Sequence, residues 1–519
     1  MLLEEFLENS AWRFSQKTAL VCRNGCLTYF DVERRANKFA NALIASSVRR
    51  GDRVVVCLEN CCESAICVFG ILKASGVFVL LDDTIKSGRL HYILKDCGAA
   101  AIVLSAEKFQ NVREAIEASP YIQAVYLRGM TEPVQPGGRA ACFSLDRTID
   151  TDGLIGPPPK RSIDADLAAL IYTSGTTGRP KGVMLTHLNM YSASKSVVSY
   201  LENDAGDVFL SALRLSYSYG LYQLLTGVMV GGTVILESPM AHPNVLLEKI
   251  SSQRVTAFPM VPTTAALLLQ SDLSEYDLAS LRYITSAGAP LPQKYIFALR
   301  QMLPNVKIFI MYGQTECKRI SYLPPQQLDD RSDSVGIPIP NEEVFIIDES
   351  GRPVGPGTVG ELVVRGSHVM RGYWGLPEES KRVLRPGPLP GERVLHTGDL
   401  FRMDRDGYLY FIGRKDDIIK TRGEKVSPKE IEDVLYGIEG ILEAAAVGVP
   451  DEFLGQSILA VVTLREGFSI SAQEILRHCS QHLEDFKVPQ RVEIRASLPK
   501  TDRGKIDHRT LRNQVQTLS

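Results

Sequence analysis

Short runs of apolar residues alternate with helix-like segments along most of the chain. The helix-like segments include residues 244–253 and 292–303. The apolar runs cover residues 53–58, 100–106, 167–172, 233–238, 255–261, 281–288 and 306–313. Runs that are apolar throughout, in alternation with helices, are typical of parallel strands buried on both faces. The sequence therefore predicts an α/β fold built on parallel sheets.

Three of the predicted strands end in polar turns that contain glycine. The turns read YTSGTTG at residues 172–178, TSAGAP at residues 285–290 and MYGQTE at residues 311–316. In open α/β sheets, ligands gather at the carboxyl ends of the strands. We therefore expect these three turns to meet at one ligand site.

The first turn continues as YTSGTTGRPKGV, residues 172–183, a segment poor in bulky side chains. Glycine lets a backbone approach a ligand closely, and successive N–H groups can bind an anion. The loop suits phosphate, with Lys181 as a point charge. It is not of the Walker type, because Gly175 is followed five places later by Pro180 rather than by a second glycine. An ordinary surface turn is the alternative, which the loop alone does not exclude.

A chain of 519 residues is too long for one core, and its texture changes after about residue 330. Residues 334–366 have frequent Gly and Pro between short strands, which is typical of a small β-rich subdomain. Ser427 and Pro428 have the residue types of a helix N-cap and first helical position. Strands and helices mix after that point, so the last ~100 residues are predicted to form a separate small α+β domain.

Composition and charge exclude several classes of function. A formal net charge of −2 gives no reason to expect nucleic acid or an acidic membrane as partner. The ten cysteines include no repeated C-x-x-C, so neither a zinc site nor a disulfide framework is indicated. We therefore expect reduced thiols in a cytoplasmic protein. The N-terminus also starts with acidic residues where a signal peptide would need basic ones.

Residues 215–236 carry no charge and are long enough to span a bilayer. Polar side chains and the pair Gly231–Gly232 interrupt the stretch. A buried helix, a glycine break and a strand explain this pattern better than a membrane helix. We therefore predict no transmembrane span.

Taken together, the motifs resemble those of the adenylate-forming (AMP-binding) superfamily. That superfamily includes acyl-CoA and aryl-CoA ligases, peptide-synthetase adenylation domains and firefly luciferase. The matching stretches follow the family's order over nearly the whole chain: YTSGTTGRPKGV, TSAGAPL, MYGQTE, GELVVRG, TGDL, GRKDDIIKTRGEKVSPKEIE and LPKTDRGKID. One glycine-rich loop would be weak evidence, whereas seven ordered motifs make a chance resemblance very improbable.

The resemblance implies two half-reactions. A carboxylate attacks the α-phosphate of ATP to give acyl-AMP and pyrophosphate, and a thiol then displaces AMP to give a thioester. ATP, Mg²⁺ and either CoA or the phosphopantetheine of an acyl carrier protein are implied. The implied fold has a large N-terminal domain of stacked α/β sheets with a small β-rich subdomain, residues 1–415. A small mobile α+β domain follows at residues 416–519. No oligomeric state follows from the sequence.

The resemblance also implies residues that bind ATP. The β- and γ-phosphates would be held by Thr173, Ser174, Gly175, Thr176, Thr177, Gly178 and Lys181. The adenosine would contact Gly288, Ala289, Pro290, Tyr312, Gly313, Gln314, Asp399, Phe411 and Arg414. Among these, Tyr312 offers a flat face for adenine and Asp399 offers acceptors for the ribose hydroxyls. Thr315 would hydrogen-bond the α-phosphate, and Glu316 would ligate Mg²⁺, a cation that takes one or two carboxylates beside phosphate oxygens.

Three residues are implied in the C-terminal domain. Lys505 would reach both the acid and the α-phosphate, because attack of one anion on another needs positive charge between them. It lies outside the domain that carries the ATP motifs, so the two domains must close for the reaction. Asp416 matches the family's hinge. Gly423 would line the passage of the thiol arm, where the absence of a side chain leaves room.

The acid pocket is expected around the segment RLSYSYGLYQLL, residues 214–225. Amino-acid-activating relatives place an aspartate where this chain has Ser218, after the aromatic Tyr217. A buried ammonium without a counter-charge is costly, so the acid is expected to lack an α-amino group. The remaining residues assigned to the pocket are Val261, Pro262 and Ser286. Apolar lining favours a fatty acid first and an aryl acid second.

Two other readings stay open at this point. One is a ligase that loads a carrier protein instead of CoA. The other is a binding protein that keeps the fold without catalysis, because fold alone does not imply function. The presence of Glu316, Asp399, Arg414 and Lys505 together argues against the second reading. Neither His187 nor Cys317 is given a chemical role: one is a helix-start residue and the other a packed wall residue.

Overall fold

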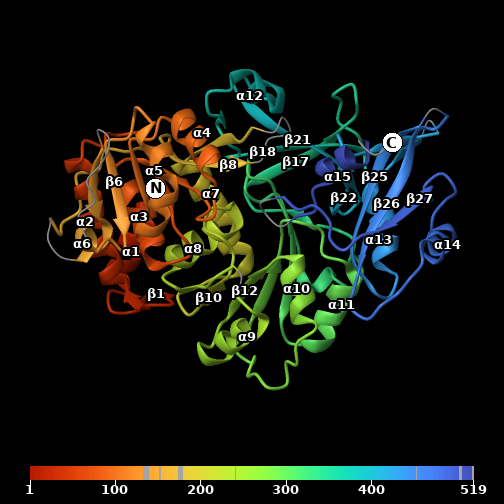
Figure 1. Ribbon diagram of the computed structural model, residues 1–519, viewed down its shortest axis with the longest axis horizontal. Helices are drawn as coiled ribbons and strands as arrows, with labels where there is room; N and C mark the ends of the chain where they lie inside the picture. The colour runs from red at the N-terminus through yellow and green to blue at the C-terminus, as the bar shows by residue number, and fades with distance from the viewer. Residues whose placement is uncertain are drawn as a thin grey trace.

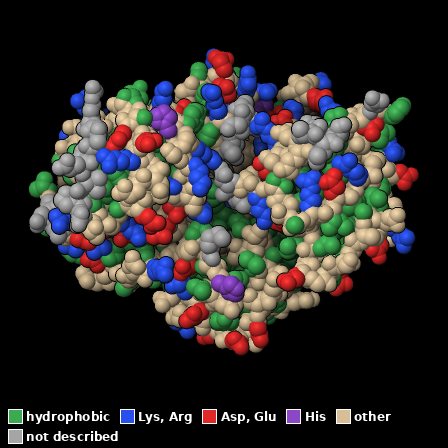
Figure 2. All heavy atoms as spheres, in the orientation of Figure 1, with side chains coloured by type: hydrophobic (Ala, Val, Ile, Leu, Met, Phe, Trp, Pro, Cys, Tyr) green, Lys and Arg blue, Asp and Glu red, His purple; other side chains and the backbone are tan. Residues whose placement is uncertain are grey.

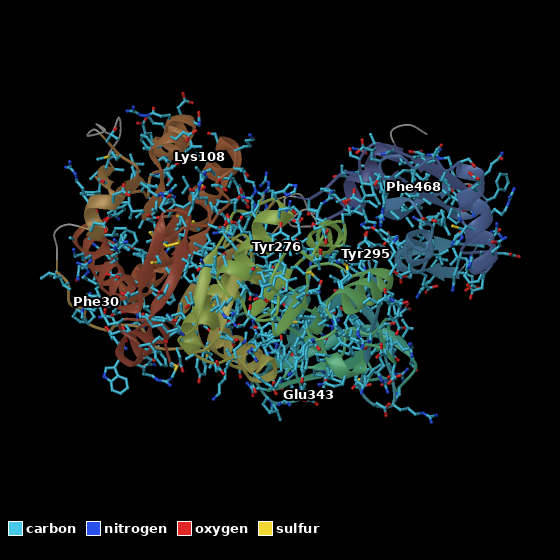
Figure 3. The ribbon with its side chains drawn as sticks, turned by 90° about the horizontal axis from the view of Figure 1, so that it is seen from below. Phe30, Lys108, Tyr276, Tyr295, Glu343 and Phe468 are labelled. Carbon is cyan, nitrogen blue, oxygen red and sulfur yellow. A yellow bond between two sulfur atoms is a disulfide. The ribbon has the colours of Figure 1, made fainter. Side chains whose placement is uncertain are left out.

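The computed structural model describes residues 1–131, 140–150, 154–173, 179–239, 241–422, 424–451, 453–501 and 505–516. Figure 1 shows the N-terminal sheets and helices on the left, green elements below, and the C-terminal part in blue on the right. Figure 3 gives the view from below, in which the C-terminal part, with Phe468, forms its own lobe. Tyr295 of the larger part lies on the side that faces that lobe.

The first sheet runs in the order β19-β9-β8-β4-β3-β5-β6-β7. Its strands are β3 (Arg53–Cys57), β4 (Val77–Leu80), β5 (Ala101–Ser105), β6 (Ala124–Arg128), β7 (Ala141–Ser144), β8 (Leu167–Thr173), β9 (Lys181–Thr186) and β19 (Gly372–Tyr373). The strands from β7 to β8 pair in parallel, and β9 returns antiparallel on β8. The predicted parallel α/β sheet is therefore confirmed.

The second sheet runs in the order β16-β15-β14-β13-β12-β10-β11-β1-β2. Its strands are β1 (Thr18–Cys22), β2 (Gly25–Thr28), β10 (Val208–Ser211), β11 (Thr233–Leu236), β12 (Ala257–Met260), β13 (Tyr283–Ser286), β14 (Lys307–Tyr312), β15 (Ser321–Leu323) and β16 (Ile337–Pro338). Its centre is parallel, so the carboxyl ends of β13 and β14 lie at one edge. That edge carries two of the three glycine-containing turns.

Helices cover the faces of both sheets. Their bounds are α1 (Glu4–Arg13), α2 (Tyr29–Ala45), α3 (Cys62–Lys73), α4 (Ser87–Cys97), α5 (Ala106–Glu117), α6 (Leu145–Asp150), α7 (His187–Leu201), α8 (Ser218–Val230), α9 (Pro243–Ser252), α10 (Pro262–Leu268) and α11 (Gln293–Met302), with a 3₁₀ turn η1 (Pro325–Gln327). The two segments predicted as helical from their pattern are α9 and α11.

A smaller antiparallel sheet follows in the order β17-β18-β21-β20, with β22 on β21. It consists of β17 (Glu342–Ile347), β18 (Val359–Gly366), β20 (Leu384–Pro386), β21 (Arg393–Met403) and β22 (Leu409–Arg414), with α12 (Pro377–Val383) beside it. This is the β-rich subdomain that the Gly and Pro pattern predicts.

The C-terminal part has its own sheets, the hairpin β23-β24 and the sheet β25-β26-β27. Its elements are β23 (Ile419–Thr421), β24 (Glu424–Val426), α13 (Pro428–Tyr436), β25 (Ile441–Asp451), β26 (Gly455–Leu464), α14 (Ala472–His482), β27 (Arg491–Ile494) and α15 (His508–Gln516). Ser427 is the N-cap of α13, as predicted, although its hydroxyl donates to the carbonyl of Ile412 instead of capping the helix. A domain boundary at residue 416 stays a prediction, and it would fall in the turn between β22 and β23.

The core shows why the apolar runs lack polar alternation. In β3, Val54 and Val56 belong to one hydrophobic cluster, whereas Val55 and Cys57 belong to another on the opposite face. Successive side chains of a strand point to opposite faces, so a strand covered on both sides must be apolar at every position.

The uncharged stretch at residues 215–236 forms α8, a glycine break and β11. Gly231 ends α8 with a φ of 78°, a left-handed conformation that glycine adopts without steric cost. The prediction of a buried helix followed by a strand is confirmed. Across the described ranges, none of the helices combines the length and the apolar character that crossing a bilayer requires.

The expectation of reduced thiols throughout is wrong for one pair. Cys22, at the end of β1, forms a disulfide with Cys62, at the start of α3. The two residues are 40 positions apart in sequence, with Cα atoms 6.0 Å apart. The spacing of cysteines in a sequence indicates only pairs that are close in sequence. Cys22 and Cys62 meet because the start of a helix packs against the end of a strand.

Candidate active site

The predicted phosphate loop joins β8 to β9, and its two flanks are well defined. Thr173 pairs with Lys181 across the two antiparallel strands. Five predicted members of the loop lie outside the described residues: Ser174, Gly175, Thr176, Thr177 and Gly178. The ammonium of Lys181 lies 5.2 Å from the ring centroid of Tyr373 in β19. The lysine is therefore held at the edge where the first sheet meets the MYGQTE turn.

Tyr373 links that lysine to Glu316. Its hydroxyl donates a hydrogen bond of 2.8 Å to Oε1 of Glu316, and burial raises the pKa of the tyrosine. The backbone carbonyl of Glu316 also accepts from the N–H of Met370 at 2.7 Å. Thr315 beside it is buried. Lys181, Tyr373 and Glu316 thus form one cluster from three separate strands and turns, and Tyr373 is a member that no sequence motif singled out.

Asp399, in β21, is the buried carboxylate of the site. Its Oδ2 accepts hydrogen bonds from the hydroxyl of Tyr312 and from Nε2 of Gln314, the latter at 2.9 Å. Its Oδ1 is buried and accepts no hydrogen bond from the described residues, with Nε of Arg414 at 3.3 Å. Burial raises the pKa of Asp399, and the charge of Arg414 opposes that rise. One acceptor oxygen is thus open, and it fits a hydroxyl donor such as a ribose.

Aromatic rings stack behind Asp399. The ring of Tyr312 lies 4.9 Å from that of Phe401 and 6.1 Å from that of Phe411, measured between centroids. Phe401 and Phe411 are opposite each other in the β21–β22 ladder. Gly313 follows Tyr312, and a Cβ there would lie 2.4 Å from the carbonyl oxygen of Lys318, so a side chain has no room at that position. The rings support the wall against which a flat base would lie.

Lys505 meets the large domain at Gly288. A Cβ on Gly288 would lie 3.9 Å from Cε of Lys505 and 4.0 Å from Cγ1 of Val261. Gly288 has a φ of 98°, and Ala289 and Pro290 after it are exposed. This exposed turn is therefore open to a ligand while the lysine of the C-terminal domain lies next to it.

The residues predicted for the acid pocket lie near that turn. Tyr217 is the N-cap of α8, Ser218 is its first residue, and Val261 and Pro262 begin α10 in the same way. Ser286, at the end of β13, is 1% exposed, and within the described ranges its Oγ has no hydrogen-bond partner. The carbonyl of Ser218 accepts a hydrogen bond of 2.9 Å from Nζ of Lys318, a residue that the sequence analysis missed. Its only sequence signal is a pair of cations directly after the MYGQTE turn.

The segment between the two domains has an exposed Asp416 at its centre. The N–H of Lys415 donates to the carbonyl of Gly398 at 2.9 Å, and that of Asp417 to the carbonyl of Arg414 at 3.0 Å. No hydrogen bond of the Asp416 N–H is found in the described part of the chain. Gly423 lies outside the described residues, between β23 and β24.

His187 and Cys317 have structural surroundings. His187 is the first residue of α7, and its Nδ1 accepts from the N–H of Leu3 at 3.2 Å. Burial lowers the pKa of His187 to about 4, so the ring is neutral at pH 7. Burial raises the pKa of the Cys317 thiol, which makes a thiolate nucleophile unfavourable.

The space-filling view agrees with a site in the middle of the molecule. Figure 2 shows that face hollowed near its centre, with hydrophobic side chains in the hollow and Lys and Arg side chains beside it. The described residues of the candidate site come from the first sheet, the second sheet, the β-rich subdomain and the C-terminal domain. A flat aromatic wall, an open carboxylate oxygen and two lysines are the groups that a nucleoside polyphosphate requires.

Comparisons with known proteins agree with this arrangement. Residues 7–374 match the family model of the AMP-binding enzyme, and residues 430–505 match that of the AMP-binding enzyme C-terminal domain. A long-chain-fatty-acid–CoA ligase of Salmonella typhimurium is 31% identical over 99% of this chain and 94% of its own length. A feruloyl-CoA synthase of Amycolatopsis sp is 34% identical over 95% of each chain.

A solved structure extends the comparison to the fold. The anthranilate CoA ligase AuaEII, in complex with anthranoyl-AMP, superposes with a TM-score of 0.89 at 28% identity. The match covers 100% of this chain and 98% of that one. The likeness therefore includes the large N-terminal domain and the small C-terminal domain together.

Proposed function

Because this chain belongs to the family of AMP-binding enzymes, we propose that the residues of its candidate site activate a carboxylic acid with ATP and pass the acyl group to CoA. The family and the CoA ligases among its relatives identify it as an AMP-forming acid–CoA ligase. The reaction has two halves, formation of acyl-AMP with release of pyrophosphate and transfer of the acyl group to the thiol. The assignment of residues to each half, and the class of acid, are our proposal.

The contact between Lys505 and the Gly288 turn carries the proposal. It brings Cε of Lys505, on the small domain, to within 3.9 Å of the Cβ position of a turn on the large domain. Attack of a carboxylate on the α-phosphate brings two anions together, and a lysine between them stabilises the transition state. We assign Lys505 that role, with Thr315 as a hydrogen-bond donor to the same phosphate.

The nucleotide is assigned to the groups around Asp399. The open Oδ1 of Asp399 accepts a ribose hydroxyl, and the charge of Arg414 beside it favours the ionised carboxylate. Adenine lies between the ring of Tyr312 and the exposed turn at residues 288–290. The loop at residues 173–178 and Lys181 hold the β- and γ-phosphates that leave as pyrophosphate. The role of the loop stays a prediction, because most of it lies outside the described residues.

Glu316 is the residue that we propose as a ligand of Mg²⁺. In the described ranges, no three His, Cys, Asp or Glu side chains gather as a metal centre. Mg²⁺ bound to nucleotide phosphates needs only one or two protein carboxylates, because phosphate and water oxygens complete its shell. A carboxylate oriented by the hydroxyl of Tyr373 meets that requirement. When bound, the ion would neutralise charge on the phosphates.

The surroundings of Ser218 support an acid without an α-amino group. Nζ of Lys318 donates to the carbonyl of Ser218, so a basic amine and not a carboxylate lies at this point of the proposed pocket. An α-ammonium there would have no counter-charge. Val261 and Pro262 add apolar lining. A fatty acid is the first choice for the carbon skeleton and an aryl acid the second, and the two relatives named above include a ligase for each kind.

The second half-reaction requires the C-terminal domain to turn. Lys505 occupies the Gly288 turn in this structure, which suits the first half-reaction. We propose Asp416 as the hinge and Gly423 as the lining of the thiol passage in the other arrangement. Such a movement about one or two backbone positions is a recognised way to use one site for two steps.

The test is a panel in which two steps are measured separately. Pyrophosphate release is followed with amino acids, fatty acids and aryl acids, and thioester formation is then followed with CoA and with carrier protein. Specificity is compared as kcat/KM, because it is a ratio of those values. A best substrate among the α-amino acids would overturn the assignment of Ser218, and thioester formation on carrier protein alone would replace CoA as acceptor.

A further inference from the structure

Two consecutive cations, Lys318 and Arg319, lie buried just after the MYGQTE turn. Lys318 is 5% exposed and Arg319 is 3% exposed. Lys318 has a φ of 62°, a left-handed conformation that is uncommon for residues other than glycine. Residues held in such conformations concentrate at functional sites. The charge of Arg319 has no part in the roles proposed above.

Arg319 lacks a partner for its charge. Its Nε is buried without a hydrogen bond, and its side chain makes no ion pair within the described part of the chain. The buried carboxylate of Glu342 lies 2.8 Å from Nε2 of His368 instead. The guanidinium carbon does lie 5.2 Å from the ring centroid of Tyr219. A cation–π contact compensates for only part of the cost of burying an ion.

Among the described residues, the buried amine of Lys318, unlike the Arg319 side chain, has a hydrogen-bond partner. Its Nζ donates to the carbonyl of Ser218 at 2.9 Å and lies 4.4 Å from the ring centroid of Tyr222.

Tyr219 connects these cations to the proposed acid pocket. Its hydroxyl donates to the carbonyl of Thr285 at 2.9 Å. Thr285 precedes Ser286, whose buried Oγ has no hydrogen-bond partner among the described residues. Two residues further on, Gly288 is the position next to Lys505. The end of β13 and Tyr219 therefore connect the Gly288 turn to the two cations by a chain of contacts.

We propose that Arg319 and Lys318 form a subsite for a second carboxylate at the far end of the acid, so that the enzyme activates one end of a dicarboxylic acid. The inference rests on the proposed function, because it deepens the class of acid. A guanidinium matches a carboxylate with two parallel hydrogen bonds. A monocarboxylic acid of the same length would fill the pocket and leave Arg319 buried and unpaired, which is the costly state.

Matched pairs of acids test the proposal on the unchanged enzyme. Pyrophosphate release is measured with hexanedioate against hexanoate, decanedioate against decanoate, and terephthalate against benzoate. For the pair of the right length, we expect kcat/KM to favour the diacid by about 10²-fold, the size of a buried charge pair. A preference for the monoacid in every pair would overturn the subsite.

Variants of Arg319 separate recognition from structure. Arg319→Met should abolish the preference for the diacid while leaving the melting temperature equal or higher, because an apolar residue replaces an unpaired buried charge. Arg319→Lys should keep part of the preference. Arg352→Met, a loss of an exposed arginine on the β17–β18 turn, is the control and should keep all of it. An unchanged preference in Arg319→Met would contradict the proposal, as would a large fall in melting temperature with the preference retained.

A binding measurement that needs no catalysis distinguishes failure of the subsite from failure of the proposed reaction. A diacid that binds the folded enzyme raises its melting temperature. Stabilisation by the diacid in the parental enzyme, and its loss in Arg319→Met, would support the subsite even if no acid released pyrophosphate. In that event the proposed reaction, and not the subsite, would fail. Absence of any stabilisation and of any diacid turnover would refute the subsite.

Discussion

Lys505 and Gly288 are 217 positions apart in sequence, and a Cβ on Gly288 would lie 3.9 Å from Cε of Lys505. A charge on the C-terminal domain is therefore held against a turn of the large domain. A second contact between the domains lies at α11, where Nζ of Lys294 donates to the carbonyl of Tyr436. This is the domain arrangement that the role proposed for Lys505 in the first half-reaction requires.

Lys505→Ala should nearly abolish acyl-AMP formation. The loss should be at least ~10²-fold, as for other charges aimed at a transition state. Thioester formation from supplied acyl-AMP should fall much less, because we place Lys505 in the first half-reaction only. Lys500→Ala is the control, since Lys500 lies on the same segment but pairs with Glu443 at 2.8 Å. Equal losses in both half-reactions would remove Lys505 from its assigned role.

Glu316→Gln should weaken the dependence of the first step on magnesium. An amide oxygen brings no net charge to the ion, so the magnesium midpoint of pyrophosphate release should rise by about tenfold or more. Tyr373→Phe is the matched control, because it removes the hydroxyl bonded to Glu316 and leaves the carboxylate. We expect its midpoint to shift less than that of Glu316→Gln. If both midpoints equal the parental value, Glu316 does not bind the metal.

Asp416→Pro should spare adenylation and slow thioester formation by about tenfold or more, because proline restricts φ and blocks a second backbone state. The substitution removes no hydrogen bond of the N–H that is seen in the described ranges. Asp416→Ala tests whether the side chain itself matters, and we expect it to retain both steps. Single-turnover rates of the two half-reactions are the measurement. Thioester formation at the parental rate in the proline variant would exclude Asp416 as the hinge.

The stability of the segment that carries Lys505 should depend on pH through His508. Nε2 of His508 lies 2.7 Å from Oε1 of Glu432. Burial alone would lower the pKa of His508, but the hydrogen bond and charge of Glu432 raise it above its ordinary value near 6.5. A folded-state pKa above the unfolded value means stabilisation that is complete below about pH 6.5 and is lost as pH rises through the folded pKa.

His508→Asn and Glu432→Gln should therefore each lower the free energy of unfolding at pH 6, by about 1.5 kcal/mol. The difference from the parental protein should shrink at pH 9, where the histidine is neutral in every state. The double variant should cost little more than either single one, because both remove the same interaction. Melting curves at the two pH values are the measurement. A difference that is constant with pH would show that the pair is not an ion pair.

Local patterns were sufficient to predict much of the fold. The apolar runs predicted parallel strands because a strand such as β3, with Val54 and Val55 on opposite faces, must be apolar at each position when helices cover both sides. The break at Gly231 and the helix start at Ser427 and Pro428 also depend on neighbouring residues only. The order of the motifs then indicated the family, which the two family models confirm.

Partners far apart in sequence were decided by the tertiary structure alone. The disulfide of Cys22 with Cys62 contradicted the expectation of reduced thiols, since it requires a strand end and a helix start to meet. Likewise, no motif predicted the hydrogen bond of Tyr373 to Glu316 or the lack of a partner, among the described residues, for the charge of Arg319. Residue type and spacing predict local structure, because this depends on neighbours in the sequence. Which buried charge has a partner and which has none depends on packing that brings distant segments together.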